Sequence, residues 1–177
     1  MPTIFVTVGT TLFEALIQAV TIREALEWMS QNGYTRLVVQ YGKGAKPTIP
    51  EKAPPIQVDC YDFKASLADD MKEADLILSH AGAGTVMEIL RMQKRAAVVI
   101  NTILMHNHQT ELAHAMGERG HLYVVETPEL LLQSVDDTWN KIHEFKPTPH
   151  TGGNAHDVPH ILDHFLFHHN DDPTKTA

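Results

Sequence analysis

Two glycines, a threonine and a glutamate follow the apolar run ADLIL in the stretch SHAGAGTVMEI, residues 79–89. A glycine-rich turn between a strand and a helix lets backbone N–H groups approach a ligand closely, and the positive end of the helix dipole favours an anion. Gly82 and Gly84 would form that turn, which suits a phosphate or diphosphate. Thr85 and Glu88 also have the spacing of a helix capping box, so Glu88 could serve only as a cap.

A second turn of this kind lies in VGTTLFE, residues 8–14, after an apolar run near the start of the chain. Gly9 permits a tight turn, and the hydroxyl groups of Thr10 and Thr11 stand beside the N–H groups of the helix that we expect to follow. A phosphate could contact them. Thr11 and Glu14 also match a capping box, and the residues alone leave both interpretations open.

A third polar cluster lies in ILMHNHQTELA, residues 103–113, again after an apolar run. Asn107, His108 and Gln109 stand just before a segment of helical periodicity. A solvated loop would have the same composition, so this cluster indicates a binding site only in combination with the other two turns.

The elements that must position these turns alternate along the chain. Apolar, β-branched runs occupy residues 3–8, 36–41, 56–61, 75–79, 96–100 and 122–126. Apolar residues recur at helical spacing over 12–29, 67–74, 86–93, 112–116 and 130–139. This alternation predicts an α/β fold with right-handed crossovers and a parallel sheet. Ligands of open parallel sheets bind at the carboxyl ends of the strands, where all three turns lie.

Two segments fall outside this alternation. Residues 42–56 are rich in proline, lysine and glycine and are expected to form a loop. The globular pattern stops near residue 146, so we expect one domain over 1–145 and a linker, a helix and a tail over 146–177. The helix would lie in VPHILDHFLF, whose apolar side chains share one face.

Composition excludes several classes of function. The 177 residues carry 14 basic and 22 acidic side chains, which argues against broad electrostatic binding to nucleic acid or an anionic membrane. The single cysteine, Cys60, excludes an internal disulfide framework, and it is expected to be a small core residue rather than a nucleophile. Without a signal-peptide pattern or a run of 18 apolar residues, we expect a cytosolic protein.

Familiar motifs also argue against other chemistries. Met87 stands where the dinucleotide fingerprint needs its third glycine, and GKGAKP lacks the spacing of a P-loop. No C-x-x-C, H-E-x-x-H or G-x-S-x-G sequence occurs. Six of the 12 histidines lie between residues 150 and 169, but without the spacing of metal ligands, and we expect no metal site.

Together, FVTVGTT, DLILSHAGAGTVMEIL and LMHNHQTELA resemble, in order and spacing, the cytosolic subunit of the UDP-N-acetylglucosamine transferase of asparagine-linked glycosylation, within glycosyltransferase family 28. The resemblance covers residues 3 to about 127. It implies a Rossmann-like, nucleotide-sugar-binding domain over 1–145, with helices on both faces of the sheet, similar to the C-terminal half of a GT-B enzyme. A separate membrane-anchored subunit would bind the lipid-linked GlcNAc acceptor. From its apolar face alone, the helix expected within residues 146–177 would either fold back onto the sheet or dock that partner. The pair would add the second GlcNAc to GlcNAc-diphosphate-dolichol at the cytosolic face of the endoplasmic reticulum.

The resemblance also implies a set of donor-binding residues, namely Gly9, Thr10, Thr11, His80, Gly82, Ala83, Gly84, Thr85, Glu88, Asn107 and Gln109. The first three would border the donor diphosphate, and residues 82–85 would cradle it with backbone N–H groups. Glu88 would accept hydrogen bonds from the ribose hydroxyls. The amides of Asn107 and Gln109 would face the sugar, because an amide both donates and accepts toward hydroxyl groups.

The implied reaction is an inverting transfer that uses neither a metal nor another cofactor. This chain would stabilise the UDP leaving group, while the base that deprotonates the acceptor has no candidate here and is expected on the partner. Asp69 and Asp70 lie in a predicted helix and are expected to be solvated. The alternatives are a stand-alone nucleotide-sugar-binding protein and a nucleotide-dependent oxidoreductase, which would need the third glycine that this sequence lacks.

Overall fold

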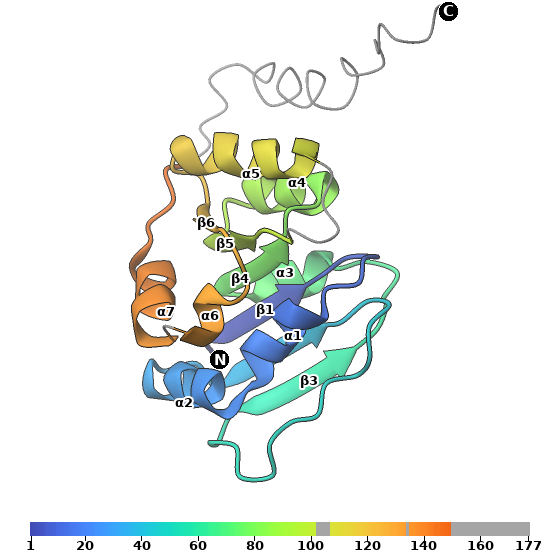
Figure 1. Cartoon of the computed structure of the whole chain (residues 1–177), viewed down its shortest axis with the longest axis vertical. Coiled ribbons are helices and arrows are strands. Elements are labelled where there is room, and N and C mark those ends of the chain that lie inside the picture. The colour runs from blue at the N-terminus through green and yellow to red at the C-terminus, as the bar shows by residue number, and fades with distance from the viewer. Residues whose placement is uncertain (102–106, 134, 150–177) are drawn as a thin grey trace, which may run out of the picture.

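The computed structural model describes residues 1–101, 107–133 and 135–149, which form a parallel sheet flanked by helices (Figure 1). The strands are β1 (Thr3–Thr7), β2 (Arg36–Gln40), β3 (Gln57–Tyr61), β4 (Leu76–His80), β5 (Ala96–Val99) and β6 (Tyr123–Val125). They pair in the order β3-β2-β1-β4-β5-β6, and each pairing is parallel. The expected α/β fold is confirmed, and each expected run forms a strand.

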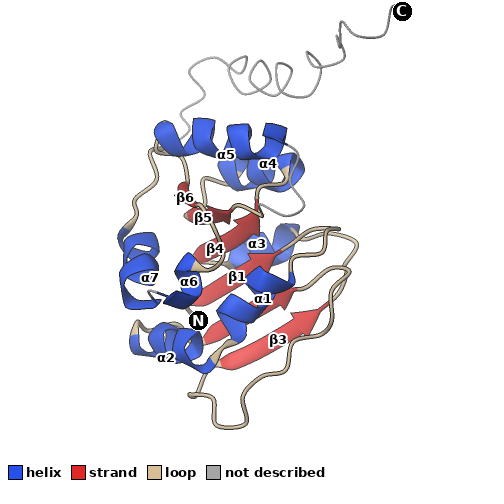
Figure 2. Cartoon of the chain, in the orientation of Figure 1, coloured by secondary structure: helices blue, strands red, loops and turns tan. Residues whose placement is uncertain are grey.

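The helices are α1 (Glu14–Thr21), α2 (Arg23–Gln31), α3 (Ala68–Glu73), α4 (Ala83–Arg91), α5 (Asn107–Glu118), α6 (Leu130–Gln133) and α7 (Val135–Glu144). They cover both faces of the sheet (Figure 2) because successive side chains of a strand point to opposite sides. Ile4 and Val6 pack with α1, α2, α6 and α7 on one face. Phe5 and Ile77 pack with α3 and α4 on the other, where α5 joins α4 through a cluster that includes Val98.

The single helix expected over residues 12–29 is wrong, because the chain breaks at Ile22. The ψ angle of Ile22 is 156°, so α1 ends at Thr21 and α2 begins one residue after the break. Residues 20–22 are all β-branched, which lowers helix propensity. The Thr21 hydroxyl also donates to the Ile17 carbonyl at 2.8 Å, a bond that often bends helices.

Near the end of the described chain, two helices stand where one was expected over residues 130–139. α6 ends at Gln133 and α7 begins at Val135, with Ser134 outside the described residues. α7 packs on α2: the Trp28 and Trp139 ring centroids lie 5.3 Å apart, and the Trp28 indole N–H donates to Asn140 Oδ1 at 3.0 Å. These contacts bring the end of the fold against its first helices.

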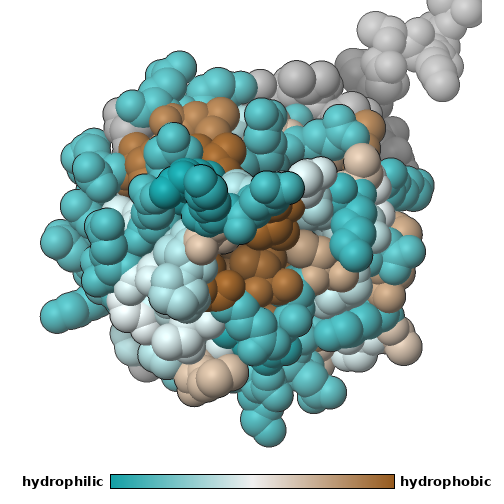
Figure 3. All heavy atoms as spheres, turned by 90° about the horizontal axis from the view of Figure 1, so that it is seen from below, coloured by the Kyte–Doolittle hydropathy of each residue, from teal (hydrophilic) through white to brown (hydrophobic). Residues whose placement is uncertain are grey.

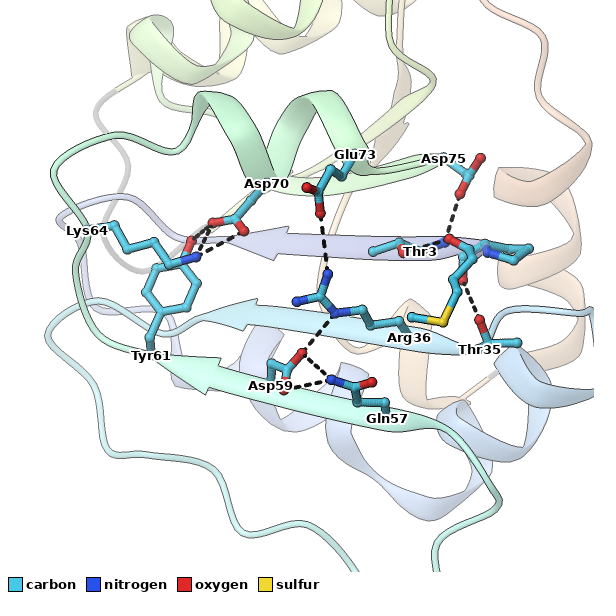
Figure 4. Close-up of polar contacts among 12 residues, drawn as sticks. Thr3, Thr35, Arg36, Gln57, Asp59, Tyr61, Lys64, Asp70, Glu73 and Asp75 are labelled. Carbon is cyan, nitrogen blue, oxygen red and sulfur yellow. Dashed lines mark hydrogen bonds and ion pairs between the residues drawn. The ribbon is translucent and has the colours of Figure 1, made fainter.

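The β3 edge of the sheet carries charged and polar side chains (Figure 4). Arg36 Nε lies 2.8 Å from Asp59 Oδ2 on the neighbouring strand, and an Arg36 terminal nitrogen lies 3.3 Å from Glu73 on α3. Charges on an edge strand oppose pairing with another chain. Loop 42–56, which leads into this edge, contains neither helix nor strand, as expected.

Asp70 is bound rather than solvated, contrary to expectation. The Tyr61 hydroxyl donates to Asp70 Oδ2 at 2.5 Å, and Lys64 Nζ lies 2.8 Å from the same oxygen (Figure 4). Burial and the bond to Asp70 raise the pKa of the Tyr61 phenol. Asp69, one position earlier on α3, is exposed as expected. The difference arises because Asp70 faces the end of β3, where Tyr61 meets it.

The remaining surface features are ordinary for a folded domain. Cys60 is half-buried in β3 and packs against the main core, as expected, and burial raises the pKa of its thiol, which disfavours the thiolate. The face shown in Figure 3 is largely hydrophilic, with apolar side chains gathered near its centre. None of the helices in the described ranges has the length and apolar composition to cross a membrane.

Candidate functional site

The strand order brings the carboxyl ends of β1, β4 and β5 to one edge of the sheet. β1 pairs with β2 on one side and with β4 on the other, so the order of strands reverses beside β1. The crevice at the carboxyl ends of such a reversal is where α/β sheets bind ligands. The turns after β1 and β4 flank this crevice, and β5 is the next strand along.

The turn after β1 is closed by hydrogen bonds within the protein. Gln40, at the end of β2, is 1% exposed. Its Oε1 accepts the Thr7 hydroxyl at 2.6 Å and the Gly9 N–H at 2.9 Å. Its Nε2 donates to the carbonyl oxygens of Gly9 and Asp62, both at 2.7 Å. The peptide groups on both sides of Gly9 are therefore fixed, and its N–H already has acceptors.

Thr11 is engaged in the same turn. Its N–H and its hydroxyl both donate to the Val8 carbonyl, at 3.1 and 2.7 Å. The capping box with Glu14 is wrong, because Phe13 is the N-cap of α1 and no side chain caps this helix. Thr10 is exposed, and its N–H and hydroxyl have no partner among the described residues. Thr10 is thus the part of this turn that is open to a ligand.

The turn after β4 is open. α4 begins at Ala83 with Gly82 as its N-cap, and no side chain caps it. The N–H groups of Ala83, Gly84 and Thr85 lie in the first helical turn, where they have no intrahelical acceptor, and none of the described residues accepts from them. Thr85 is inside the helix, so its capping box with Glu88 is also wrong. The amides and the positive end of the dipole are available to an anion.

Glu88 lies further along the same helix. Its side chain is half-buried and makes no hydrogen bond or ion pair within the part of the chain that the structure describes. A partly buried carboxylate is normally paired or hydrogen-bonded. With the capping role removed, Glu88 is free to accept hydrogen bonds from a ligand at the end of β4.

His80 joins the two turns. A Cβ atom added at Gly82 would lie 2.3 Å from His80 Nε2, and one added at Gly9 would lie 2.8 Å from His80 Cε1. The imidazole therefore packs against both glycines, and neither position has room for a larger residue. Glycine is needed at position 9 for a second reason, because its φ is +59°.

Burial of the His80 imidazole favours its neutral form. Its side chain is 7% exposed, and burial lowers its pKa, an effect that the Thr7 backbone opposes only in part. Nδ1 is buried without a well-formed hydrogen bond to any described residue. A neutral ring can donate one hydrogen bond toward the crevice without adding a charge.

The third turn lies mostly outside the described residues. Residues 102–106 are not described, and α5 begins at Asn107. The positions of the Asn107 and His108 side chains are likewise not described, whereas Gln109 is half-buried on α5. Asn101, at the end of β5, donates from Nδ2 to the Leu12 carbonyl at 3.4 Å. This contact connects the end of β5 to the turn after β1.

Gln40 is the important residue that the motif analysis did not single out. It is the fifth residue of the run RLVVQY, in which the apolar pattern indicates only a strand. A glutamine that closes an otherwise apolar buried strand needs hydrogen-bond partners, and this requirement was the available signal. Within the described residues, no group of three or more histidine, cysteine or acidic side chains is arranged to hold a metal ion.

Known proteins that are similar to this chain identify its family. A family model described as the glycosyltransferase family 28 C-terminal domain matches residues 3–163. The UDP-N-acetylglucosamine transferase subunit ALG13 of Homo sapiens is 44% identical over 123 residues, 70% of this chain and 11% of the human protein. The subunit of the same name from Kluyveromyces lactis is 30% identical over 188 residues, 80% of this chain and 94% of the yeast protein. The chain thus spans about a tenth of its human relative and nearly all of this yeast relative.

Solved structures agree on the fold. An NMR solution structure of ALG13 has a TM-score of 0.64 at 23% identity and covers 93% of this chain and 94% of that one. MurG of Acinetobacter baumannii has a TM-score of 0.57 at 21% identity, covering 92% of this chain and 49% of MurG. The match to half of MurG confirms the expected likeness to the C-terminal half of a GT-B enzyme. The chain belongs to the family of glycosyltransferase family 28 C-terminal domains.

Proposed function

We propose that this chain is the UDP-GlcNAc-binding subunit of a two-component transferase that adds the second GlcNAc to GlcNAc-diphosphate-dolichol. The observation that carries the proposal is the open start of α4, which lies beside the buried His80 and is followed by Glu88, a carboxylate without a partner among the described residues. Family membership and relatives named as UDP-N-acetylglucosamine transferase subunits support it.

In this proposal the donor lies over β4 and β5. The N–H groups of residues 83–85 bind the diphosphate, with a hydrogen bond from His80. Glu88 accepts from the ribose hydroxyls, and Asn107 and Gln109 face the sugar. Gly9 and Thr11 support this site by holding the turn after β1, and Thr10 borders the diphosphate.

The chemistry assigned to this chain is stabilisation of the leaving group. As the glycosidic bond breaks, negative charge grows on the UDP oxygen, and amides fixed at a helix start stabilise that charge without reorganising. Glu14 is exposed at the start of α1 and Glu88 is assigned to the ribose, so the general base is placed on the partner. No step requires a metal, and chelation with EDTA should leave transfer unchanged.

The partner is proposed to be a membrane-anchored subunit that binds the acceptor and brings this chain to the cytosolic face of the endoplasmic reticulum. Residues 146–177 are proposed to dock it, although residues 150–177 lie outside the described residues. Thr148 should remain in any truncation, because its N–H donates to the Gly120 carbonyl at 2.8 Å and its carbonyl lies 3.0 Å from His121 Nδ1.

The deciding experiment is co-expression with the membrane partner, followed by a transfer assay with UDP-GlcNAc and a lipid-linked GlcNAc acceptor. The pair should be active and the chain alone inactive. A chain truncated after Pro149 should bind UDP-GlcNAc normally but neither co-purify with the partner nor restore transfer. UDP-GlcNAc binding without transfer by the pair would favour a stand-alone binding protein, and transfer by the chain alone would refute the two-component arrangement.

A further inference from the structure

The His80 ring lies at the start of α4 without a satisfied polar atom of its own. Its side chain is 7% exposed, and neither ring nitrogen makes a well-formed hydrogen bond to a described residue. Nε2 faces the two turns: it would lie 2.3 Å from a Cβ atom added at Gly82, the N-cap of α4, and 3.3 Å from one added at Gly9. Buried polar groups normally have hydrogen-bond partners, so this ring is suited to a ligand at the same place.

Two features of the fold disfavour a positive charge on this ring. Burial lowers the pKa of His80, and the Thr7 backbone opposes that effect only in part. The first amides of α4 have no acceptors among the described residues, and the positive end of the helix dipole repels a cation beside it. Without an anion in the crevice, the ring therefore favours its neutral form.

The described elements around the ring supply few other charges. β2 ends at Gln40 and Asn101 follows β5, and both side chains are neutral amides. The turn after β1 carries no charge before Glu14, which is exposed, and Glu88 stands in the second turn of α4. No charged side chain is among the causes that shift the pKa of His80. A bound ligand would therefore be the main charge to which the ring responds.

We propose that His80 takes up a proton when the diphosphate of the donor binds at the start of α4, so that donor binding strengthens as the pH falls. This inference rests on the proposed function. The donor diphosphate carries a negative charge on each phosphate, and an opposite charge within about 4–6 Å favours the charged form of a histidine. The imidazolium donates from both ring nitrogens, so it can bond to the Thr7 backbone and to the ligand together.

The direction of the pH dependence follows from linkage between proton and donor. Without the donor, the pKa of His80 lies below its ordinary value of 6.5, and the bound anion raises it. Between the free and the bound values, the complex holds a proton that the free chain lacks. The association constant therefore falls as the pH rises through this window and is level above it.

Calorimetry of the full chain with UDP-GlcNAc counts the protons. This ligand lacks the terminal phosphate that titrates near pH 6 in UDP, so a proton taken up must be bound by the protein. Titrations at about pH 6.5, in buffers of different ionisation enthalpy, should show uptake of roughly half a proton per donor. The association constant should fall about fivefold between about pH 6 and about pH 8. Nitrogen NMR shifts of the His80 ring should move toward those of imidazolium when the donor is added.

His80→Gln separates a titrating ring from a ring that only fills space, because its amide can donate but cannot titrate. At about pH 8 it should bind UDP-GlcNAc within about threefold of the wild type, since one donor is retained, and its affinity should not depend on pH. His114→Asn is the matched control: His114 lies on α5, with Nε2 3.5 Å from Glu126, and its loss should leave the proton uptake unchanged. Glu88→Gln should bind more weakly but keep the same proton count.

Several outcomes would overturn the inference. One is donor binding by the wild type without proton uptake or without a change in the His80 ring shifts, which needs no variant. Another is uptake that persists in His80→Gln, or that disappears in Glu88→Gln or in His108→Gln while His80 is intact. Each of these outcomes leaves the proposed function standing, whereas a chain that does not bind UDP-GlcNAc at any pH would remove both.

Discussion

The turns after β1 and β4 are alike in sequence, since each has glycine, then threonine, and a glutamate at capping distance. In the structure they differ. In the first, the N–H groups of Gly9 and Thr11 are bonded to Gln40 and the Val8 carbonyl, whereas the second leaves the first amides of α4 without acceptors among the described residues. Glycine and threonine in a strand–helix turn therefore do not define an anion site. A backbone amide is available to an anion only if it does not already have an acceptor. At the first turn Gln40, 31 positions after Gly9, supplies that acceptor.

Of the variants that test this difference between the two turns, a substitution of Gln40 should have the largest effect. Gln40→Met keeps the volume of the side chain but removes the acceptor of the Gly9 N–H and the donor to two carbonyls, leaving buried polar groups unpaired. The free energy of unfolding should fall by about 3 kcal/mol in urea denaturation. Gln57→Met, at the exposed first position of β3, should change it by less than about 0.5 kcal/mol. Equal losses of unfolding free energy in the two variants would show that the hydrogen bonds of Gln40 contribute no more to stability than those of an exposed residue.

Glu88 tests whether the open side binds a ligand. Glu88→Gln removes a charge that has no partner in the described fold, so the melting temperature should stay nearly unchanged. Calorimetry should show UDP binding weakened by about 1.5–3 kcal/mol, the usual contribution of hydrogen bonds to a charged group. Unchanged UDP affinity would rule out the ribose role.

Alanine substitutions of the two glycines in the turn after β4 should have opposite effects on stability. Gly82→Ala would place a Cβ 2.3 Å from His80 Nε2, so the ring must move, and stability should fall by about 1–2 kcal/mol. A Cβ atom added at Gly84 would meet no atom within 4 Å, and Gly84 lies in a helix. The stability of Gly84→Ala should therefore rise by up to about 1 kcal/mol. UDP affinity should nevertheless fall in Gly84→Ala if a ligand approaches this backbone. Gain of stability with full UDP affinity would place the ligand elsewhere.

His80 gives a smaller effect that depends on pH. Burial lowers its pKa in the folded chain below the ordinary value of 6.5. Between these two values the unfolded chain binds a proton that the folded chain does not, so stability falls as the pH drops below about 6.5. His80→Asn should lose less stability than the wild type between about pH 7 and about pH 5. Identical losses in urea denaturation at each pH would mean that the ring takes up its proton within the fold.

Most of the fold could be predicted because it depends on local pattern. Apolar runs bounded by turns located the strands, and their alternation with helical segments required parallel pairing. The prediction failed at Ile22, where periodicity continued across a β-branched break in the chain. It failed at Asp70 because a partner from β3 decides whether that carboxylate is solvated. The spacing of apolar residues encodes neither the β-branched break at Ile22 nor the distant partner of Asp70.

The candidate site was predictable in location and less so in detail. Strand ends and glycines indicated which turns meet, and the sheet order brings β1, β4 and β5 together. The sequence could not show that Thr11 bonds to Val8, or that Thr85 lies inside its helix. Gln40 was missed because its role depends on partners at positions 7, 9 and 62, which only the folded sheet brings within reach.

The bonds of Gln40 also set an order on folding. Gln40 lies 31 residues after Gly9 and 22 residues before Asp62, and its amide bonds to both. During synthesis, β1 and its turn leave the ribosome long before the strand that completes them, so the first native turn waits for β2 and then for the chain beyond β3. This non-local closure couples the turn after β1 to β2 and to the residue that follows β3. An N-terminal fragment that ends before Asp62 would keep the bonds between Gln40 and Gly9 but lose the one to the Asp62 carbonyl.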